Sequence, residues 1–288
     1  MTGTMRLPIS GRADRLAAAA VWTTSALVAA VFVWIAADVA TRGLAHLSWS
    51  FVVDAPRDAG RSGGIFPILV STALILGVCL AVAVPLGVGT AVLLAEYTRQ
   101  AGPFSRVVRG SLEVLAGMPS IVFGLFGNAL FTVVLGLGFS ILSGGVTLAC
   151  MVLPILVRTL EEGLRAVPDE YRRAAAALGL SQATILWRLI LPAAAPALVV
   201  GLVLGIGRAL AETAALLFTS GYVDRLPGSL LDSGRTLSIH VYDLAMNVPG
   251  GEAAAAASAL VLVALLLAIN VVTTWIGHRW LHGRLLSA

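Results

Sequence analysis

The stretch VPDEYRRAAAALGLSQATILWRLILP, Val167–Pro192, is polar and rich in alanine, yet it lies between two long apolar runs. Pro168 suits the first turn of a helix, because the N–H group that it lacks would have no partner there. Asp169 and Glu170 favour the positive N-terminal end of the same helix. The sequence therefore predicts a short helix that begins at Pro168 and ends at Leu178.

The second half of this stretch predicts a turn and another short helix. Gly179 is the expected C-cap, because glycine adopts the left-handed conformation without strain. Ser181 is the expected N-cap of a helix that continues to Ile190, and Pro192 then opens the next apolar run. Two short helices around a glycine turn form a rigid element that can dock a partner protein. A solvated loop with some helicity is the alternative, and the residue pattern favours neither.

The composition of the whole chain is that of a membrane protein. Only 12% of its 288 residues are charged, whereas soluble domains carry about 25%, and its mean hydropathy is +0.94. A membrane-spanning helix needs about 20 mainly apolar residues. We therefore expect an all-α polytopic membrane protein with six transmembrane helices. The six spans are expected at residues 16–39, 65–96, 112–137, 145–160, 193–220 and 253–277.

The arginines predict how these spans are oriented. With the N-terminus inside, 13 arginines fall in cytoplasmic segments, five fall outside and Arg208 lies in the membrane, as the positive-inside rule requires. Six spans then return the C-terminus to the cytoplasm. The first span could instead be a secretory signal, but its apolar run exceeds the about 7–15 residues of such signals. We expect it to be a retained helix.

The chain is expected to divide into three parts. Residues 1–64 form an N-terminal tail, the first transmembrane helix and an outer loop. Residues 65–280 form a core of five helices, and residues 281–288 form a C-terminal tail. The core carries a cytoplasmic loop at residues 161–191, which contains the stretch quoted above, and an outer loop at residues 221–252.

A second stretch, GIGRALAETAALLF at Gly205–Phe218, places Arg208 and Glu212 inside the fifth span. Their i, i+4 spacing predicts that both lie on one face of one helix. Each charge costs about 2.5–3.5 kcal/mol at the bilayer centre on translocon scales, so this face must meet protein or water. The functional interpretation is an anion pathway, in which Arg208 contacts an oxyanion and Glu212 holds the guanidinium in place. A structural ion pair is the alternative.

Other residues within the spans give weaker signals. Pro119 interrupts the third span and Pro85 lies in the second, and a proline inside a helix removes a backbone hydrogen bond and bends the helix. We expect kinks at both prolines, which either line a pathway or serve packing. Ser120, beside the Pro119 kink, and Thr213, beside Glu212, add hydroxyl groups to the candidate substrate pathway.

Several other kinds of function find no support in the residues. Cys79 and Cys150 have no metal-binding spacing and the four histidines are dispersed, so no metal site is predicted. The arginines are scattered along the chain, which argues against nucleic-acid binding. The sequence contains no GxxxxGK[ST] loop and no nucleophile–base pair. We therefore expect this chain to bind no ATP and no cofactor, and to be no enzyme by itself.

The opening stretch resembles the EAA loop of the permease subunits of ABC importers, in which a Glu-Ala-Ala triplet is followed by a glycine and then by Ile-Leu-Pro. Ala174, Ala175 and Gly179 fit this pattern, as do residues 190–192, whereas Arg173 stands where the family has its glutamate. The resemblance implies coupling helices that dock into an ATP-binding subunit. The expected docking residues are Glu170, Arg173, Ala174, Ala175, Gly179 and Leu180.

More of the chain is similar to the PstA-type branch, the permeases of phosphate-specific ABC importers. The likeness covers roughly residues 63 to 280 and is carried by GGIFPILVSTALIL, VPLGVGTAVLLAEY, LAGMPSIVFGLFG and GRALAETAALLFTSG, which begin at Gly63, Val84, Leu115 and Gly207. Residues 211–215 read Ala-Glu-Thr-Ala-Ala, where the branch commonly has Gly-Glu-Thr-Ala-Pro. The resemblance implies the type I ABC importer permease fold.

This resemblance also implies a function and partners. The function is phosphate import across the cytoplasmic (inner) membrane, with Arg208 and Glu212 in the pathway. The partners are a second related permease that completes a heterodimer, a homodimeric ATP-binding subunit that holds ATP and Mg²⁺, and an extracytoplasmic phosphate-binding protein that docks on the outer loops. Acidic residues outnumber basic ones in the outer loop: Asp224, Asp232, Asp243 and Glu252 against Arg225 and Arg235.

Three other functions remain open. An ABC permease for sulfate, molybdate or phosphonate would share the same features, and transport competition distinguishes these solutes. A secondary transporter or channel that works alone predicts inverted repeats or paired broken helices, and it leaves the EAA-like loop unexplained. A membrane scaffold without transport activity has no use for two charges inside a span.

Overall fold

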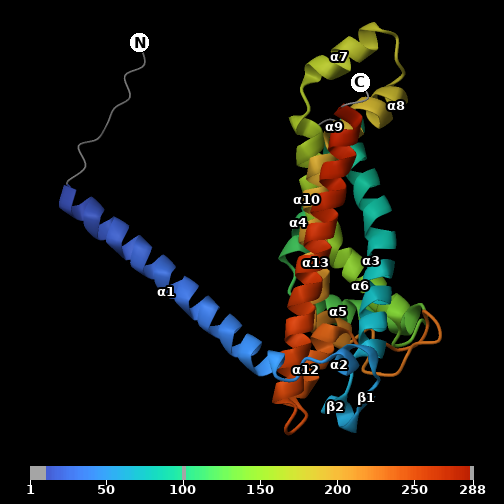
Figure 1. The fold of residues 1–288 in the computed structure, drawn as a ribbon. Coiled ribbons are helices and arrows are strands. Elements are labelled where there is room, and N and C mark those ends of the chain that lie inside the picture. The colour runs from blue at the N-terminus through green and yellow to red at the C-terminus, as the bar shows by residue number, and fades with distance from the viewer. Residues whose placement is uncertain (1–10, 99–101, 286–288) are drawn as a thin grey trace.

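The computed structural model describes residues 11–98 and 102–285 and is a helical bundle (Figure 1). A two-stranded antiparallel hairpin of β1 (Pro56–Arg57) and β2 (Ser62–Gly63) lies at one end. The α-helices are α1 (Gly11–Leu44), α2 (Trp49–Val53), α3 (Phe66–Val92), α4 (Pro103–Gly117), α5 (Ser120–Gly127), α6 (Ile141–Ala166), α7 (Asp169–Ala177), α8 (Gln182–Ile185), α9 (Leu191–Ala193), α10 (Ala195–Ala211), α11 (Ala214–Leu217), α12 (Leu237–Met246) and α13 (Glu252–Leu285). Helical turns of other pitch cover Asp58–Gly60, Leu93–Tyr97, Asn128–Val134 and Leu186–Ile190.

The centre of the bundle is α6, which packs against α3 on one side and α10 on another. Glycines permit these close approaches. A Cβ atom on Gly87 of α3 would lie 2.6 Å from Leu156 of α6, and a Cβ atom on Gly205 of α10 would lie 2.6 Å from Val152 of α6. Small residues let helix backbones come together where lipid tails remove the hydrophobic driving force between helices. These contacts hold α3, α6 and α10 as one body.

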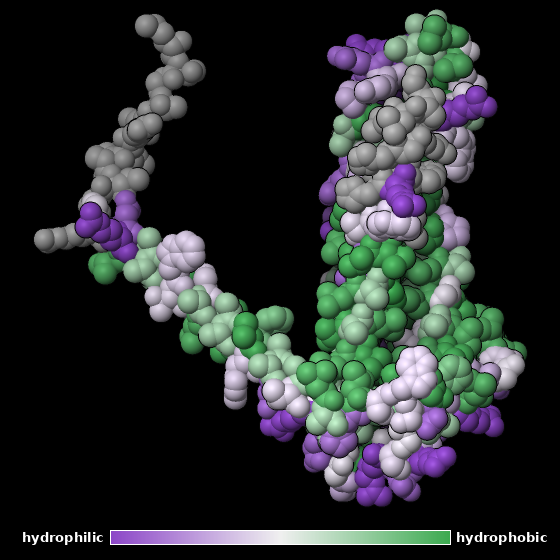
Figure 2. Space-filling model, in the orientation of Figure 1, coloured by the Kyte–Doolittle hydropathy of each residue, from purple (hydrophilic) through white to green (hydrophobic). Residues whose placement is uncertain are grey.

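Polarity is layered along the bundle. In the view of Figure 2, hydrophobic residues cover its middle and hydrophilic residues gather toward its two ends. The elements α7 and α8 lie at one end, together with the last residues of α13, whereas α12 and the β-hairpin lie at the other end (Figure 1). This distribution is that of a protein that crosses a bilayer.

Four helices are long and apolar enough to cross a membrane, or up to six if each of two bent helix pairs counts as one span. The helix of the fourth span is longer than the predicted residues 145–160, because α6 begins at Ile141 and continues to Ala166. The extra turns carry Glu161 and Arg165, which pair with each other at 2.8 Å. Charged residues that mark a loop in the sequence therefore lie inside a helix.

The third span is not the single kinked helix that the sequence predicts. α4 and the segment from Ser120 are bent by 107°, and both Met118 (ψ 134°) and Pro119 (ψ 144°) have extended backbone. Proline disfavours the helical conformation of the residue before it, so the helix ends before Met118 instead of bending through it. Pro85, in contrast, lies inside α3, which continues unbroken to Val92, and a kink there stays a prediction.

The fifth span is interrupted at both ends. Pro192 lies in the short helix α9, and α10 begins only at Ala195 after a bend of 61°. The prediction that Pro192 opens this span is therefore wrong, because Pro196 in the first turn of α10 cannot continue a helix from α9. At the other end α10 stops at Ala211, since Glu212 has extended backbone (φ −75°, ψ 127°).

Helix α1 stands apart from the bundle (Figure 1). None of the residues in its apolar window is buried within the chain. Its C-terminal end alone meets α13, where a Cβ atom on Gly43 would lie 2.7 Å from the carbonyl oxygen of Ala256. An apolar helix without protein neighbours is stable only in lipid or against another chain.

The outer loop at residues 221–252 is more ordered than the sequence predicts. It contains the helix α12, whose N-cap Thr236 accepts a hydrogen bond from Ile239 N–H. His240 of this helix is completely buried. The Arg235 guanidinium pairs with Asp243 at 3.1 Å and donates from Nε to the carbonyl of Tyr222 at 3.0 Å. These contacts fold the loop back onto the end of the bundle.

Candidate functional site

At one end of the bundle, α7 and α8 form the helix–glycine–helix element that the sequence predicts. Gly179 has a φ of +75°. Its N–H donates to the carbonyl of Ala176 at 2.9 Å, and Leu180 N–H donates to the carbonyl of Ala175 at 3.2 Å; this bond pair defines a Schellman motif. Ser181 accepts a hydrogen bond from Thr184 N–H, so the predicted N-cap is confirmed. We call residues 169–190 the α7–α8 element.

The α7–α8 element presents most of its predicted docking residues outward. Ala175 is the exception, since it is buried in an apolar cluster with Ile185 and Leu186. Large apolar side chains that the sequence reading missed are also exposed: Leu178 to 80% and Trp187 to 63%. Exposed apolar groups of this kind, rimmed by polar residues, mark an interaction surface. The exposed docking residues are Glu170, Arg173, Ala174, Gly179 and Leu180.

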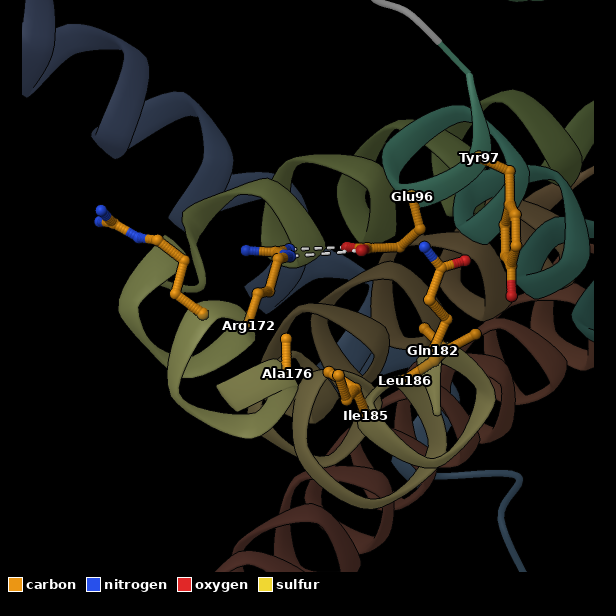
Figure 3. Close-up of a pocket in the computed structure, with 8 residues that line it drawn as sticks. Glu96, Tyr97, Arg172, Ala176, Gln182, Ile185 and Leu186 are labelled. Carbon is orange, nitrogen blue, oxygen red and sulfur yellow. Dashed lines mark hydrogen bonds and ion pairs between the residues drawn. The ribbon is translucent and has the colours of Figure 1, made fainter. Parts of the chain in front are cut away.

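Arg172 fixes the α7–α8 element to the bundle. Its guanidinium donates to Glu96 at 2.6 and 3.2 Å, and both residues line a cavity of about 390 Å³ (Figure 3). The same group donates to the carbonyls of Val167 at 2.8 Å and Leu164 at 2.9 Å. The hydrogen bonds with Glu96 raise the pKa of Arg172 above its ordinary value, so the side chain stays charged. Sequence reading missed this pair, because its members are 76 residues apart.

The predicted pairing of Arg208 with Glu212 is wrong. Arg208 lies in the last turn of α10 and is exposed, whereas Glu212 lies beyond the helix and is only 9% exposed. Among the residues that the structure describes, Arg208 forms no ion pair and no side-chain hydrogen bond. The i, i+4 relation fails because the helix ends at Ala211, one residue before the carboxylate.

Glu212 instead closes the break between α10 and α11. Its Oε1 atom accepts a hydrogen bond from Ala215 N–H at 3.1 Å, which satisfies a backbone donor in the first turn of α11. Its backbone carbonyl accepts a hydrogen bond from the Ser238 hydroxyl of α12 at 2.6 Å. Thr213, which follows, is half-buried. The break therefore depends on contacts from α11 and α12.

Helix α5 packs directly on this break. A Cβ atom on Gly124 of α5 would lie 2.8 Å from the Cα atom of Ala215 in α11. Asn128, just beyond α5, donates from its amide to the carbonyl of Phe218 at 2.7 Å. Ser120, at the start of α5, is half-buried. The bent third span and the broken fifth span thus meet. As a result α5, which begins at Ser120, lies against the segment that follows Glu212 and Thr213.

One face of α10 is exposed along its length and carries Arg208. Val200 is exposed to 51% and Leu204 to 53%, and Arg208 and Ala211 continue the same stripe. Spacings of three and four residues place all four side chains on one helix face. A single cation at the end of an otherwise apolar stripe is suited to meeting an anion.

Acidic residues of the outer loop are less available than their number suggests. Asp243 is paired with Arg235, and Asp232 accepts a hydrogen bond from Gly228 N–H at 2.7 Å through its carboxylate. The expected excess of free acids on this loop therefore does not hold for these two residues. Glu252, in contrast, is exposed at the start of α13.

Comparison with known proteins identifies the family. A family model described as "Binding-protein-dependent transport system inner membrane component" matches residues 83–282. The chain belongs to this family. The matched residues include the α7–α8 element, Glu212 and the exposed face of α10, so the family core of this permease contains every candidate site residue named above.

Several curated relatives match most of this permease. The probable ABC transporter permease protein YqgI of Bacillus subtilis is 31% identical over 282 residues, with 92% of this chain and 95% of that protein covered. The phosphate transport system permease protein PstA of Mycobacterium leprae is 34% identical over 255 residues, with 86% and 83% covered. PstA 1 of Mycobacterium tuberculosis is 42% identical over 161 residues, with 56% and 52% covered.

A solved structure confirms the fold. The MetNI methionine ABC transporter, in an inward-facing conformation, matches with a TM-score of 0.54 and 18% sequence identity. The match covers 76% of this permease and 94% of that chain. The permease therefore has the type I ABC importer permease fold that the sequence predicts.

Proposed function

We propose that this permease moves inorganic phosphate into the cell as one subunit of an ABC importer. The observation that carries this proposal is the 34% identity with PstA of Mycobacterium leprae over 86% of the chain. A second PstA protein, from Haemophilus influenzae, is 30% identical over 83% of the chain. Likeness to phosphate permeases over most of the length favours phosphate above other oxyanions.

Arg208 supplies the main contact with the anion. It is exposed on the α10 face that it shares with Val200 and Leu204. An arginine in such a face costs about 2.5–3.5 kcal/mol in lipid on translocon scales, and a water-filled pathway avoids that cost. The planar fork of guanidinium donors matches two oxygens of a tetrahedral oxyanion.

Glu212 supplies an acceptor that discriminates phosphate from sulfate. One of its oxygens, Oε1, is occupied by Ala215 N–H, which leaves Oε2 for the substrate. Monoprotonated phosphate carries a P–OH group that donates to a carboxylate, whereas sulfate carries no proton at neutral pH. The hydroxyls of Thr213 and Ser120 flank the same layer and can complete the coordination of the anion.

The energy for transport comes from a partner. The α7–α8 element, with its exposed Leu178 and Trp187, is the docking surface for a homodimeric ATP-binding subunit, which holds ATP and Mg²⁺. A second related permease covers the exposed α10 face, and an extracytoplasmic phosphate-binding protein docks at the α12 end. The arginine bias supports a cytoplasmic location for α7, α8 and both termini. This chain itself binds no cofactor.

Transport competition tests the proposal. The permease, with its partner subunits, is reconstituted in proteoliposomes, and uptake of labelled phosphate is measured with excess sulfate, molybdate or a phosphonate. We expect ATP-dependent phosphate uptake that excess sulfate does not slow. Uptake that sulfate or molybdate inhibits completely would assign the chain to that oxyanion, and phosphate uptake without ATP would assign it to secondary transport.

A further inference from the structure

Hydrogen bonds and ion pairs, joined at one step by the backbone of the turn Leu93–Tyr97, link the α7–α8 element to α4. The path begins at Arg172 of α7, which donates to Glu96 in this turn. In the same turn, the carbonyl of Leu94 accepts a hydrogen bond from Arg165 of α6 at 3.0 Å. Three separate segments are thus joined by charged groups at one end of the bundle.

Glu161 of α6 joins the fourth segment. Its Oε1 atom lies 2.8 Å from Nη2 of Arg165, one turn further along α6. The same oxygen accepts hydrogen bonds from Arg109 of α4, at 2.8 Å from Nη2 and 3.2 Å from Nε. Glu161 is only 8% exposed. A single buried carboxylate oxygen therefore holds guanidinium groups from both α4 and α6.

Helix α4, which Glu161 contacts through Arg109, is connected to the candidate pathway through α5. α4 packs mainly against α6, and after the 107° bend its chain continues as α5, which packs on Ala215 of α11. Glu212 caps that same helix. A displacement of α4 along α6 would move α5 against the break that carries the proposed phosphate contacts.

The interface between α4 and α6 also has room for such a displacement. A cavity of about 340 Å³ opens between the two helices, beside the Glu161 carboxylate, and is lined by Arg109, Glu113, Arg158 and Glu162. The turn Leu93–Tyr97 has π-helical geometry, which is often found at functional sites where a regular helix is interrupted. Beside this cavity the two helices are joined by directed charge pairs, while Leu112 of α4 packs in an apolar cluster with Leu160 and Leu164 of α6.

We propose that Glu161 is a positioning residue that transmits movement of the α7–α8 element to α4, and so couples ATP hydrolysis in the partner to opening of the anion pathway. This inference rests on the proposed function. The path runs from Arg172 to Glu96, through Leu94 and Arg165 to Glu161, and from there to Arg109. The test therefore measures the coupling between ATP hydrolysis and phosphate uptake directly.

The test compares Glu161→Gln with a matched control, Glu113→Gln, in the complete importer in proteoliposomes. Glu113 also pairs α4 with α6, through Arg158, but at 3.7 Å and with its side chain 69% exposed. We measure phosphate taken up and ATP hydrolysed by the same vesicles. For Glu161→Gln we expect the ratio of phosphate taken up to ATP hydrolysed to fall about fivefold or more, while ATP hydrolysis persists. A change of about fivefold is at the lower end of the effects that coupled sites typically have on each other. Glu113→Gln should keep the wild-type ratio.

Further variants separate coupling from folding. Arg109→Gln should also lower the ratio, and the double variant should lower it no further than Glu161→Gln does, because Glu161→Gln already weakens the contact with Arg109 as well as the contact with Arg165. Glu161→Asp, which keeps the charge, should restore part of the ratio. The proposal is overturned if Glu161→Gln and Arg109→Gln reduce uptake and hydrolysis in equal proportion, since a structural role alone predicts that result.

A failure of the substrate assignment is recognised separately. If the wild-type importer moves no phosphate, the proposed function is wrong, and coupling is then measured as stimulation of ATP hydrolysis by the importer's own binding protein. Loss of that stimulation in Glu161→Gln but not in Glu113→Gln supports the role of Glu161. Equal stimulation in both variants overturns it.

Discussion

The chain breaks helical structure at Gly179 and again at Glu212, and the two breaks are built differently. At Gly179 the backbone closes the turn alone, with a φ of +75° and two hydrogen bonds to carbonyls of α7. At Glu212 the residue is not glycine, and the turn is completed by its own carboxylate and by the Ser238 hydroxyl of α12. The break at Gly179 is therefore stabilised by residues close to it in the sequence. The break at Glu212 is stabilised also by a residue of α12 that is distant in the sequence.

The largest effect is expected at the end of α10 that leads into the second break. Arg208→Gln removes the cation but keeps the size of the side chain approximately. We expect phosphate uptake to fall about a hundredfold, because hydrogen bonds to charged groups contribute about 1.5–3 kcal/mol. Uptake and complex assembly are measured together. Val200→Ala, on the same exposed face, serves as the control and should change uptake little. Normal uptake by Arg208→Gln would show that the arginine serves packing.

Substitutions of Glu212 separate its structural role from its role in transport. Glu212→Ala removes the acceptor for Ala215 N–H, so we expect a loss of about 1–2 kcal/mol of stability, as for other helix caps. Glu212→Gln keeps a carbonyl acceptor and should lose much less stability. Thermal unfolding in detergent measures this difference. Because both variants lack the carboxylate, both should lose discrimination between phosphate and sulfate; retention of discrimination by Glu212→Gln would contradict the proposed contact.

Acid should weaken the second break and leave the first unchanged. Burial, aided by the nearby Arg235, lowers the pKa of His240 from 6.5 to about 4. The folded state then binds fewer protons than the unfolded state between these values, so stability is complete above pH 6.5 and decreases as the pH falls toward 4. The slope is at most about 1.4 kcal/mol per pH unit.

Thermal unfolding between pH 7.5 and pH 5 checks this slope. His240→Asn should flatten it, whereas His46→Asn, at an exposed position, should leave it unchanged. Since α12 holds Ser238 against Glu212, the acid-sensitive loss should begin at the α12 end of the bundle, which hydrogen exchange can locate. An equal slope in His240→Asn and wild type would contradict the assignment.

The smallest effect is expected at the first break. Gly179→Ala forces a side chain into the left-handed region, at a cost of about 1 kcal/mol. Gly89→Ala is the matched control, because its backbone is helical and a Cβ atom added there would meet no atom within 4 Å. We expect Gly179→Ala to lower the unfolding temperature and Gly89→Ala to leave it or raise it slightly. An unchanged unfolding temperature in Gly179→Ala would mean that the left-handed backbone of the Schellman turn does not contribute to the stability of the protein.

The two breaks also differ in how well the sequence predicts them. Gly179 and Ser181 carry their conformational preferences locally, so the turn and its N-cap follow from the residues alone. Glu212 lies in a run of good helix formers, and a window of sequence continues the helix through it. The break depends on Ser238 and α12, which are distant in the sequence, and local patterns contain no information about such contacts.

Ion pairs are likewise poorly predicted from local sequence. Arg208 and Glu212, four residues apart, do not pair, whereas Arg172 with Glu96 and Arg109 with Glu161 pair across separations of 76 and 52 residues. The four helices that are long and apolar enough to cross a membrane follow from hydropathy, because length and apolar character suffice to predict them. The other two predicted spans are bent helix pairs in the structure. Their bends at Pro119 and before Pro196 depend on the strict backbone limits of proline, and the sequence predicted only the first of these.

The central claim is that the exposed α10 face lines a water-filled anion pathway, and cysteine labelling tests it most directly. In a background with Cys79→Ala and Cys150→Ala, Ala211→Cys places a thiol one turn beyond Arg208, and Val263→Cys on α13 provides an exposed apolar control. In the assembled importer, we predict that a charged thiol reagent modifies Ala211→Cys, that phosphate slows the reaction and sulfate does not, and that Val263→Cys stays unreactive. If Ala211→Cys is as unreactive as Val263→Cys under every condition, the α10 face does not line the pathway and the central claim is wrong.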